Sequence, residues 1–483
     1  MQWNAPSPAQ AEHNVLSFLR FVKSASTHRS SNEVFHPDSK AAPGSISIPA
    51  ETGQQSSGSS TEADPYGSRL WYSKMVRLAG ANRELNEFSV ERLNEQPEHH
   101  LVMLHGYGAG LGFFYKNFEG LSRLPGWRLF ALDLLGMGRS SRPPFRLMSK
   151  DRQTCISEAE DWFVDALEEW RVKRKIDRFT LMGHSLGGYM AVAYAIKYPG
   201  HLNKLILASP VGIPEDPRAV NAELPDPSDS TIANEMIQDQ EEDIKKVTNP
   251  RIPEERKVGD QNNFMNARKQ REEAAQNGAS PPNRTKMSKL FTILWDANIS
   301  PFSLVRWSGP LGPRLVSGWT SRRFSHLSVE ESQALHTYAF SLMRMKGSGE
   351  YALAYILAPG AFARSPLIRR IEEVGRQQLP LPMLTPDKSG SRSSGNTREH
   401  GIPITFIYGE NDWMDVAGGF AAEQKLKDKQ TFVLQRASPD EKAKEKGAAK
   451  VLIIREAGHH VYLDGWEEFN QVMRDEMTEV SSS

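Results

Sequence analysis

Ser185 lies at the centre of a G-x-S-x-G pentapeptide that spans residues 183–187. An apolar run at 179–182 precedes the pentapeptide and predicts a strand, and an alanine-rich segment at 188–195 follows it and predicts a helix. A serine on a strained turn between a strand and a helix is typical of a nucleophile elbow, in which small flanking residues let the two elements approach closely. A chain with 36 glycines can form this pattern by accident, but the context favours a nucleophile over a plain glycine-rich turn.

A serine hydroxyl is a weak nucleophile at neutral pH, so Ser185 needs a base within hydrogen-bond reach. The last predicted strand ends near residue 454, and Gly458, His459 and His460 follow it in a loop. The position after the final strand is the usual place of the base in this kind of site. We therefore expect His459 to be the base, with His460 as the alternative.

The base in turn needs a carboxylate that orients it. Two aspartates follow the strand predicted at 404–409: Asp412, at the usual offset from the end of the strand, and Asp415, a turn farther along. Asp412 is the preferred acid and Asp415 the alternative. Asp133 also follows a predicted strand, and we expect it to brace the adjacent loop. The chain order Ser, Asp, His is that of α/β-hydrolases and differs from the orders of chymotrypsin and subtilisin.

A tetrahedral intermediate needs backbone N–H donors that are in place before its charge develops. The first is expected at Leu186, the residue after the nucleophile. The second is expected in the glycine-rich turn 105–110, where Tyr107 or Gly108 is the predicted donor. A flexible connector is the alternative for this turn, but its place two strands before the elbow favours the oxyanion role.

The elements that must position these residues alternate between strands and helices. A helix with apolar residues at helical spacing is predicted at 151–173 and another near 420–428. Apolar runs predict strands at 85–93, 101–104, 127–133, 179–182, 204–210, 404–409 and 451–454. This alternation predicts an α/β-hydrolase fold, with a mostly parallel central sheet flanked by helices and a large helical lid insertion.

The predicted core is interrupted by the lid. Its two parts are expected at 67–213 and 401–475, with the lid at 214–400 between them and a tail at 476–483. Charge runs and Pro, Asn and Gln predict disorder at about 214–286 and 380–400 within the insertion. Helical stretches are expected from 287 to 371, where Ser328 and Glu331 form a capping box.

Residues 1–66 are rich in Ser, Pro and Gly and are expected to be a disordered or targeting segment. Within them, residues 14–26 combine apolar with basic side chains, and acidic residues are scarce around them, which is typical of a mitochondrial presequence. A short surface-docking helix and an unstructured tail are the alternatives.

Composition excludes several function classes. Lys plus Arg and Asp plus Glu both number 59, so global charge gives no argument for a nucleic-acid partner. The single cysteine, Cys155, excludes an intrachain disulfide or a Cys-based zinc site and is expected to fill the core. No metal or cofactor is predicted, because the metalloprotease and nucleotide-loop motifs are missing from the sequence. The chain lacks a run of about 18 apolar residues, so any membrane contact is expected to be peripheral.

The chain resembles a lipid-acting branch of the α/β-hydrolases. This branch includes fungal mitochondrial cardiolipin-specific phospholipases, plant lysophosphatidate acyltransferase-like lipases and animal lipid-droplet coactivators. The segments that carry the resemblance are the elbow, 105–114, 133–141, 300–301, 309–312, 348–350 and 459–464. In this family a His-x4-Asp motif, here His459 and Asp464, has been linked to acyl transfer. Asp464 has an alternative role as the cap of a helix that begins near Gly465.

The resemblance implies a serine acyl hydrolase that deacylates a phospholipid. Cardiolipin or a related mitochondrial phospholipid is the favoured substrate, because 411–415 is most similar to the fungal phospholipases. A lysophosphatidate or lysophospholipid acyltransferase is the first alternative and a non-enzymatic lipid-surface regulator the second. Ser185, which the coactivators lack, favours the catalytic branch.

The implied location is the mitochondrion, peripheral to the inner membrane, and the cytoplasm or a lipid-droplet surface is the alternative. From residue 287 to 346 basic residues outnumber acidic ones and aromatic residues lie between them, which suits an anionic bilayer surface. Packing within a helical lid explains the aromatic residues equally well. The expected partners are thus a phospholipid substrate and a peripheral membrane surface, and no protein partner is predicted.

Overall fold

The computed structural model describes residues 6–20, 22–24, 64–216, 220, 300–358, 362–379 and 398–482. The disorder expected at 214–286 and 380–400 therefore lies almost wholly outside the described residues. The lid is described from residue 300 onward.

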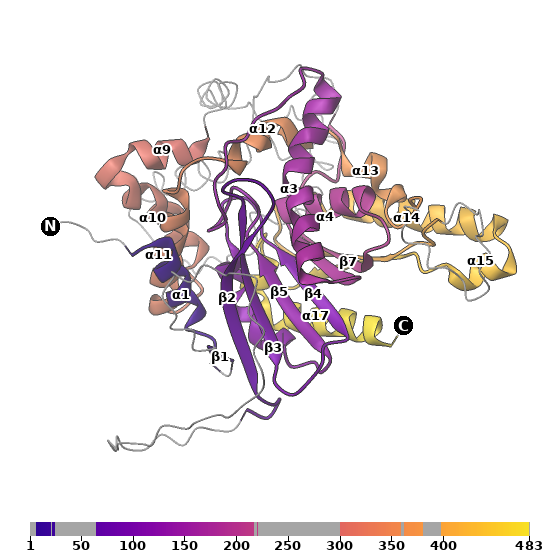
Figure 1. The fold of residues 1–483 in the computed structure, drawn as a ribbon, viewed down its shortest axis with the longest axis horizontal. Coiled ribbons are helices and arrows are strands. Elements are labelled where there is room, and N and C mark those ends of the chain that lie inside the picture. Colours follow the sequence, from indigo (N-terminus) through magenta and orange to yellow (C-terminus); the bar gives the residue numbers. More distant parts are fainter. Residues whose placement is uncertain are drawn as a thin grey trace, which may run out of the picture.

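One mixed sheet forms the centre of the described structure (Figure 1). Its strand order is β1-β2-β3-β5-β4-β6-β7-β10-β11, with β3 antiparallel to both of its neighbours and all other pairs parallel. The strands are β1 Lys23–Ser24, β2 Arg69–Arg77, β3 Glu84–Arg92, β4 His99–Leu104, β5 Trp127–Leu132, β6 Phe179–His184, β7 Leu202–Ala208, β10 Pro403–Gly409 and β11 Ala448–Ile454. This arrangement confirms the predicted α/β-hydrolase fold.

Helices cover both faces of the sheet. α3 (Arg152–Arg174), α4 (Leu186–Lys197) and α14 (Val416–Arg436) pack on one face, and α1 (Pro8–Leu16), α2 (Tyr115–Leu121) and α17 (Trp466–Ser481) pack on the other. Along β4, Leu101 and Met103 join one core cluster while Val102 joins the other, because alternate side chains of a strand point to opposite faces. The tail predicted at 476–483 is wrong up to Ser481, since Met477 is buried within α17.

The remaining helices belong to the lid or to the C-terminal part of the core. The lid contains α9 (Pro301–Trp307), α10 (Gly312–Arg323), α11 (Val329–Met343), α12 (Leu353–Ile356) and α13 (Leu367–Arg370), with the short strands β8 (Leu357–Ala358) and β9 (Phe362–Ala363). α15 (Pro439–Lys444) precedes β11, and α16 (Val461–Asp464) precedes α17. The capping box predicted from Ser328 and Glu331 begins α11.

The disorder predicted for residues 1–66 is wrong for the residues among them that the structure describes, whereas the targeting role stays a prediction. Residues 8–16 form α1, which Ser7 caps and which packs against α11 (Figure 1). Ala11, Val15 and Leu16 belong to the main core, and β1 then adds a short parallel strand beside β2. The apolar face of α1 is stabilised by tertiary packing, which the low overall hydropathy of residues 1–66 does not reveal.

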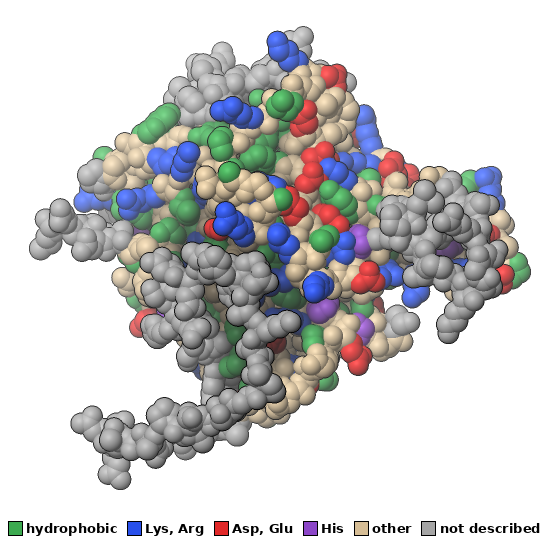
Figure 2. Space-filling model, viewed as in Figure 1, with side chains coloured by type: hydrophobic (Ala, Val, Ile, Leu, Met, Phe, Trp, Pro, Cys, Tyr) green, Lys and Arg blue, Asp and Glu red, His purple; other side chains and the backbone are tan. Residues whose placement is uncertain are grey.

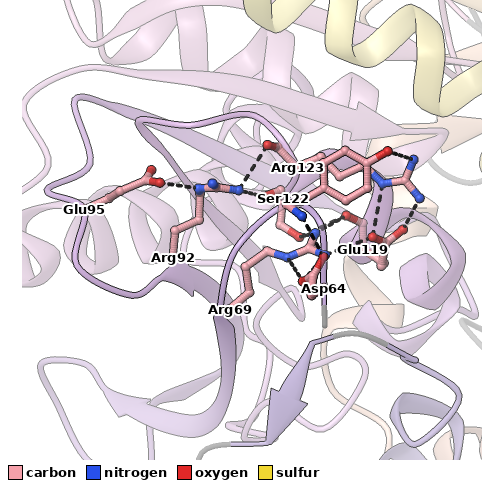
Figure 3. A network of polar contacts seen from close by, with 8 residues as sticks. Asp64, Arg69, Arg92, Glu95, Glu119, Ser122 and Arg123 are labelled. Carbon is pink, nitrogen blue, oxygen red and sulfur yellow. Dashed lines mark hydrogen bonds and ion pairs between the residues drawn. The ribbon is translucent and has the colours of Figure 1, made fainter. Parts of the chain in front are cut away.

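A polar network at the start of β2 fixes the entry of the chain into the core (Figure 3). Arg69 is 1% exposed and donates hydrogen bonds to Asp64, to Ser122 and to the carboxylate and backbone carbonyl of Glu119. All three side-chain nitrogens of Arg69 have partners. A buried charge whose donors are all satisfied by protein groups is typical of a structural role.

Candidate active site

Ser185 occupies the strained turn that the sequence predicts. Its φ of 52° and ψ of −115° lie between the end of β6 and the first residue of α4. A Cβ on Gly183 would lie 2.2 Å from the carbonyl oxygen of Gly187, and a Cβ on Gly187 would lie 2.5 Å from the carbonyl oxygen of Leu104. Because real Cβ atoms do not approach so closely, both glycines are required to bring strand, turn and helix together.

His459 is held by Asp412. Nδ1 of His459 lies 3.1 Å from Oδ1 of Asp412, which also accepts a hydrogen bond from the backbone N–H of Met414. Burial alone would raise the pKa of Asp412, but the neighbouring His459 and the hydrogen bonds outweigh burial and lower this pKa. Asp412 is therefore a carboxylate at neutral pH, as an orienting acid must be.

The alternative acid has a different task. Asp415 is the N-cap of α14, and its side chain accepts a hydrogen bond from the backbone N–H of Gly418. The structure thus brings Asp412, and not Asp415, against His459. Capping also explains why an aspartate stands at this second position.

The loop that carries the histidines is fixed from two sides. Nε2 of His184 lies 3.0 Å from the backbone carbonyl oxygen of His459, and Asp464 accepts a hydrogen bond from the backbone N–H of Gly458. The expected helix-capping role of Asp464 is wrong, because Gly465 is the N-cap of α17 and makes no side-chain cap. Asp464 orients the loop instead.

The glycine-rich turn lies directly against the nucleophile. A Cβ on Gly106 would lie 2.9 Å from Nδ1 of His184 and 3.0 Å from Cβ of Ser185, so any larger residue would have to displace one of them. Gly108 has a φ of 73°, and a Cβ there would lie 3.2 Å from the ring of Phe302 in the lid helix α9. The ring of Tyr107 stacks on Phe302 with centroids 4.8 Å apart. The lid therefore covers both candidate donors of the turn.

Leu186 is the first residue of α4. The N–H of a first helical residue has no partner within its own helix, so this donor remains free for a substrate oxygen beside Ser185. Leu186 follows Ser185 directly, and the 105–110 turn approaches Ser185 through Gly106. The oxyanion role of these donors stays a prediction.

Asp133 braces the loops, as expected. Its carboxylate accepts hydrogen bonds from the backbone N–H groups of Leu111 and Arg139 and from the side-chain amide of Asn86. The carboxylate thereby joins the oxyanion turn to the loop after β5. Cys155 is buried on α3, in agreement with its predicted place in the core.

Glu12 of α1 belongs to the same network, and sequence reasoning missed it. Its carboxylate is fully buried, pairs with Arg139 and accepts hydrogen bonds from Asn86 and from the hydroxyl of Tyr338 in α11. Burial and the nearby Asp133 raise the pKa of Glu12 to about 7, although Arg139 opposes this shift. The Ser-Pro pair, with Ser7 as the N-cap and Pro8 as the first helical residue, is a local signal for the start of α1 but not for the role of Glu12.

The outer surface of the lid is apolar and basic. Leu304 and Trp307 of α9, Leu311 of the turn that follows it and Leu315 of α10 are exposed, beside the exposed Arg314. Figure 2 shows hydrophobic and basic side chains together over this part of the surface. Within the described ranges, no helix is long and apolar enough to cross a membrane, and no three His, Cys, Asp or Glu side chains form a group suited to a metal ion.

Comparison with known proteins agrees with this fold. A model of the α/β hydrolase fold family matches residues 99–242. The 1-acylglycerol-3-phosphate O-acyltransferase of Arabidopsis thaliana is 31% identical over 75% of this chain and 66% of the plant protein. The 1-acylglycerol-3-phosphate O-acyltransferase ABHD5 of Mus musculus is 28% identical over 83% of this chain and 82% of the mouse protein.

A lipase is similar to the same extent. The (lyso)-N-acylphosphatidylethanolamine lipase of Bos taurus is 29% identical over 78% of this chain and 78% of its own length. The chain spans just under two thirds of the length of two plant relatives. By the order of its sheet, its nucleophile elbow and these matches, the chain has the α/β-hydrolase fold.

Proposed function

We propose that the protein is a serine hydrolase that removes an acyl chain from a phospholipid. The observation that carries the proposal is the bond between His459 and Asp412, on a loop that contacts His184 next to the strained Ser185. In the proposed reaction Ser185 attacks the ester carbonyl, His459 takes the serine proton, and Asp412 orients the imidazole and stabilises its charged form.

The negative oxygen of the tetrahedral intermediate is held by the N–H of Leu186 and by that of Tyr107 or Gly108. Collapse of the intermediate expels the lysophospholipid oxygen, which takes its proton from His459. Water, activated by the same histidine, then hydrolyses the acyl-enzyme and releases a fatty acid.

A phospholipid substrate is supported by the relatives, which are named for acyl transfer to 1-acylglycerol-3-phosphate and for hydrolysis of N-acylphosphatidylethanolamine. Cardiolipin, or a related mitochondrial phospholipid, is the finer proposal and rests on the resemblance of residues 411–415 to fungal phospholipases. The mitochondrial location has the same support, together with the basic, acid-poor N-terminal pattern.

The second candidate is an acyltransferase, in which a lysophospholipid replaces water as the acceptor. The names of the relatives favour it. The His459–Asp464 spacing favours it less, because the structure uses Asp464 to hold the N–H of Gly458. A non-enzymatic regulator is disfavoured by the presence of Ser185 in a complete elbow.

The exposed apolar side chains of α9 and α10, beside basic residues, support docking on an anionic bilayer. Trp307→Ala should weaken sedimentation of the protein with vesicles of phosphatidylcholine and cardiolipin, whereas Val329→Ala, an exposed apolar residue outside this patch, should not. Equal sedimentation of both variants and the wild type would count against lid docking.

The decisive experiment for the reaction is mass spectrometry of lipids incubated with wild type and Ser185→Ala. Liposomes should contain cardiolipin, phosphatidylethanolamine and phosphatidate, with and without a lysophospholipid acceptor. Serine-dependent release of fatty acid supports the hydrolase, and product that requires the acceptor supports the transferase. No serine-dependent product on any lipid would overturn both.

A further inference from the structure

Several buried polar atoms beside the His459 loop lack hydrogen-bond partners within the described structure. They are Nε and Nη2 of Arg323, Nδ1 of His460, the hydroxyl of Tyr462 and Nδ1 of His184. Buried polar groups are nearly always partnered in proteins, so such a concentration of unpartnered groups points to a missing polar ligand.

The rings of this group lie close together and close to the catalytic residues. The ring of His184 lies 4.7 Å from that of His459, 5.0 Å from that of His460 and 4.8 Å from that of Tyr462, measured between centroids. Nδ1 of His184 faces Gly106, since a Cβ there would lie 2.9 Å from it, so this atom is covered by backbone. Arg323, His460 and Tyr462 remain as the unpartnered groups of this set.

Arg323 reaches this place from the lid. It is the last residue of α10, and the next residue, Phe324, is fully buried against Phe113, whose ring in turn contacts His460. The positive charge of Arg323 acts on both His184 and Tyr462, although burial is the larger influence on the pKa of each. The guanidinium is thus within electrostatic range of the side chains around the nucleophile.

Other arginines show that the lack of partners is unusual. Arg128, Arg142 and Arg370 also have an unpartnered Nε, but each of them binds an acidic side chain or a backbone carbonyl through its terminal nitrogens. In the described structure Arg323 makes no such bond. The nearest candidate acid, Asp464, is engaged by the N–H of Gly458 and lies 3.7 Å from His326.

We propose that Arg323, with His460 and Tyr462, forms a subsite for the phosphate group of the lipid substrate. This inference rests on the proposed function and specifies which part of the substrate is recognised and where. A guanidinium presents parallel N–H donors that match two phosphate oxygens, and the phenol and imidazole supply further polar contacts. The subsite places the phosphate beside the base and leaves the acyl ester for Ser185.

Binding tests the subsite without turnover. In a Ser185→Ala background, soluble dihexanoylphosphatidate should bind, and dihexanoylglycerol, which lacks the phosphate, should bind more weakly. Arg323→Gln should weaken phosphatidate binding by about 10- to 100-fold, the usual effect of losing charged hydrogen bonds, and leave dihexanoylglycerol unchanged. The matched control is Arg314→Gln, which removes an equal charge from the exposed side of the same helix.

Activity distinguishes failure of the subsite from failure of the proposed function. With Ser185 intact, Arg323→Gln should raise KM for phosphatidate and leave kcat/KM for a neutral short-chain ester unchanged. Ester hydrolysis that depends on Ser185, with equal losses on both substrates in Arg323→Gln, would overturn the subsite alone. Hydrolysis of neither substrate would overturn the proposed function, and the binding experiment would then decide the subsite by itself.

Two further arms complete the test. Arg323→Lys keeps the positive charge but lacks the parallel N–H donors of the guanidinium, so it should restore part of the phosphatidate affinity. This variant also provides a test if Arg323→Gln fails to fold. Inorganic phosphate should compete with phosphatidate only weakly. If it binds as tightly as the lipid, or if Arg314→Gln weakens binding as much as Arg323→Gln, the assignment to a lipid phosphate is wrong.

Discussion

Two arginines in this protein make opposite use of burial. Arg69 makes five hydrogen bonds that occupy its three side-chain nitrogens, all to groups of the same chain (Figure 3). Among the described residues, two buried nitrogens of Arg323 have no partner, and neither have Nδ1 of His460 and the hydroxyl of Tyr462. The first network holds strand β2 to α2, whereas the second group lies within electrostatic range of His184, the residue before the nucleophile. The contrast separates side chains that complete the fold from those that await a ligand.

The largest effect on catalysis is expected from substitution of Asp412, and Asp415 provides the control. Asp412→Asn should lower kcat by about 10⁴-fold, because the amide favours the wrong tautomer of His459. Asp415→Asn should leave kcat nearly unchanged, and even Asp415→Ala should lose only the cap of α14, about 1 kcal/mol of stability. Steady-state kinetics and denaturant unfolding of the variants measure both effects. Equal losses of kcat in the two asparagine variants would contradict the site.

Substitution of Arg69 should lower the free energy of unfolding and leave the catalytic activity unchanged. Arg69→Met leaves Asp64 and Glu119 without their buried partner and should lower the free energy of unfolding by about 3–5 kcal/mol. Activity per folded molecule should not change, because the network lies away from the site. Urea unfolding followed by circular dichroism, with activity corrected for the folded fraction, gives both numbers. A stable but inactive Arg69→Met protein would contradict the structural role of Arg69.

Glu12 lies between these extremes, because it is partnered but has a raised pKa. Its pKa of about 7 exceeds the ordinary value of 4.5, so the folded state holds the proton more tightly than the unfolded state. Stability should therefore fall as pH rises from about 4.5 to about 7, by up to about 3 kcal/mol, and should change no further above this range. Glu12→Gln should remove this part of the pH dependence in urea unfolding. If the free energy of unfolding depends on pH in the same way in Glu12→Gln, another group causes this pH dependence.

The smallest effect is expected for the stability of Arg323→Gln. Two buried nitrogens of the Arg323 guanidinium have no partner in the described structure. Removal of this charge should therefore lower the free energy of unfolding by less than about 1 kcal/mol, or raise it. If Arg69→Met loses several times more stability in the same urea experiment, the two arginines have different roles: Arg69 supports the fold, and Arg323 does not. A loss as large as that of Arg69→Met would show that Arg323 is a structural residue.

The fold and much of the site could be predicted because their signals are local. The apolar runs gave the buried strands, and the glycines around Ser185 are required by contacts within the elbow and with the end of β4. The offset of Asp412 from the end of β10 was enough to prefer it over Asp415. In each case the residue and its structural reason lie within a few positions of each other.

The rest depends on contacts between distant parts of the chain. Glu12 gains its role from Asn86, Arg139 and Tyr338, which are 74 to 326 residues away from it in the sequence. Arg323 is one of several basic residues in the lid, and only the folded structure distinguishes it from Arg314. Neither composition nor periodicity contains this information, since both describe neighbours in sequence.

The position of Glu12 has a consequence for maturation. If import were followed by a cut anywhere between residues 24 and 64, α1 would leave with the excised peptide, and Asn86, Arg139 and Tyr338 would lose the carboxylate that joins them. The lid helix α11 would then lose its hydrogen bond to Glu12, whereas Tyr338 would still accept a hydrogen bond from the backbone N–H of Gly112. The N-terminal mass of the protein isolated from cells therefore reports whether the working form keeps α1 and this link to the lid.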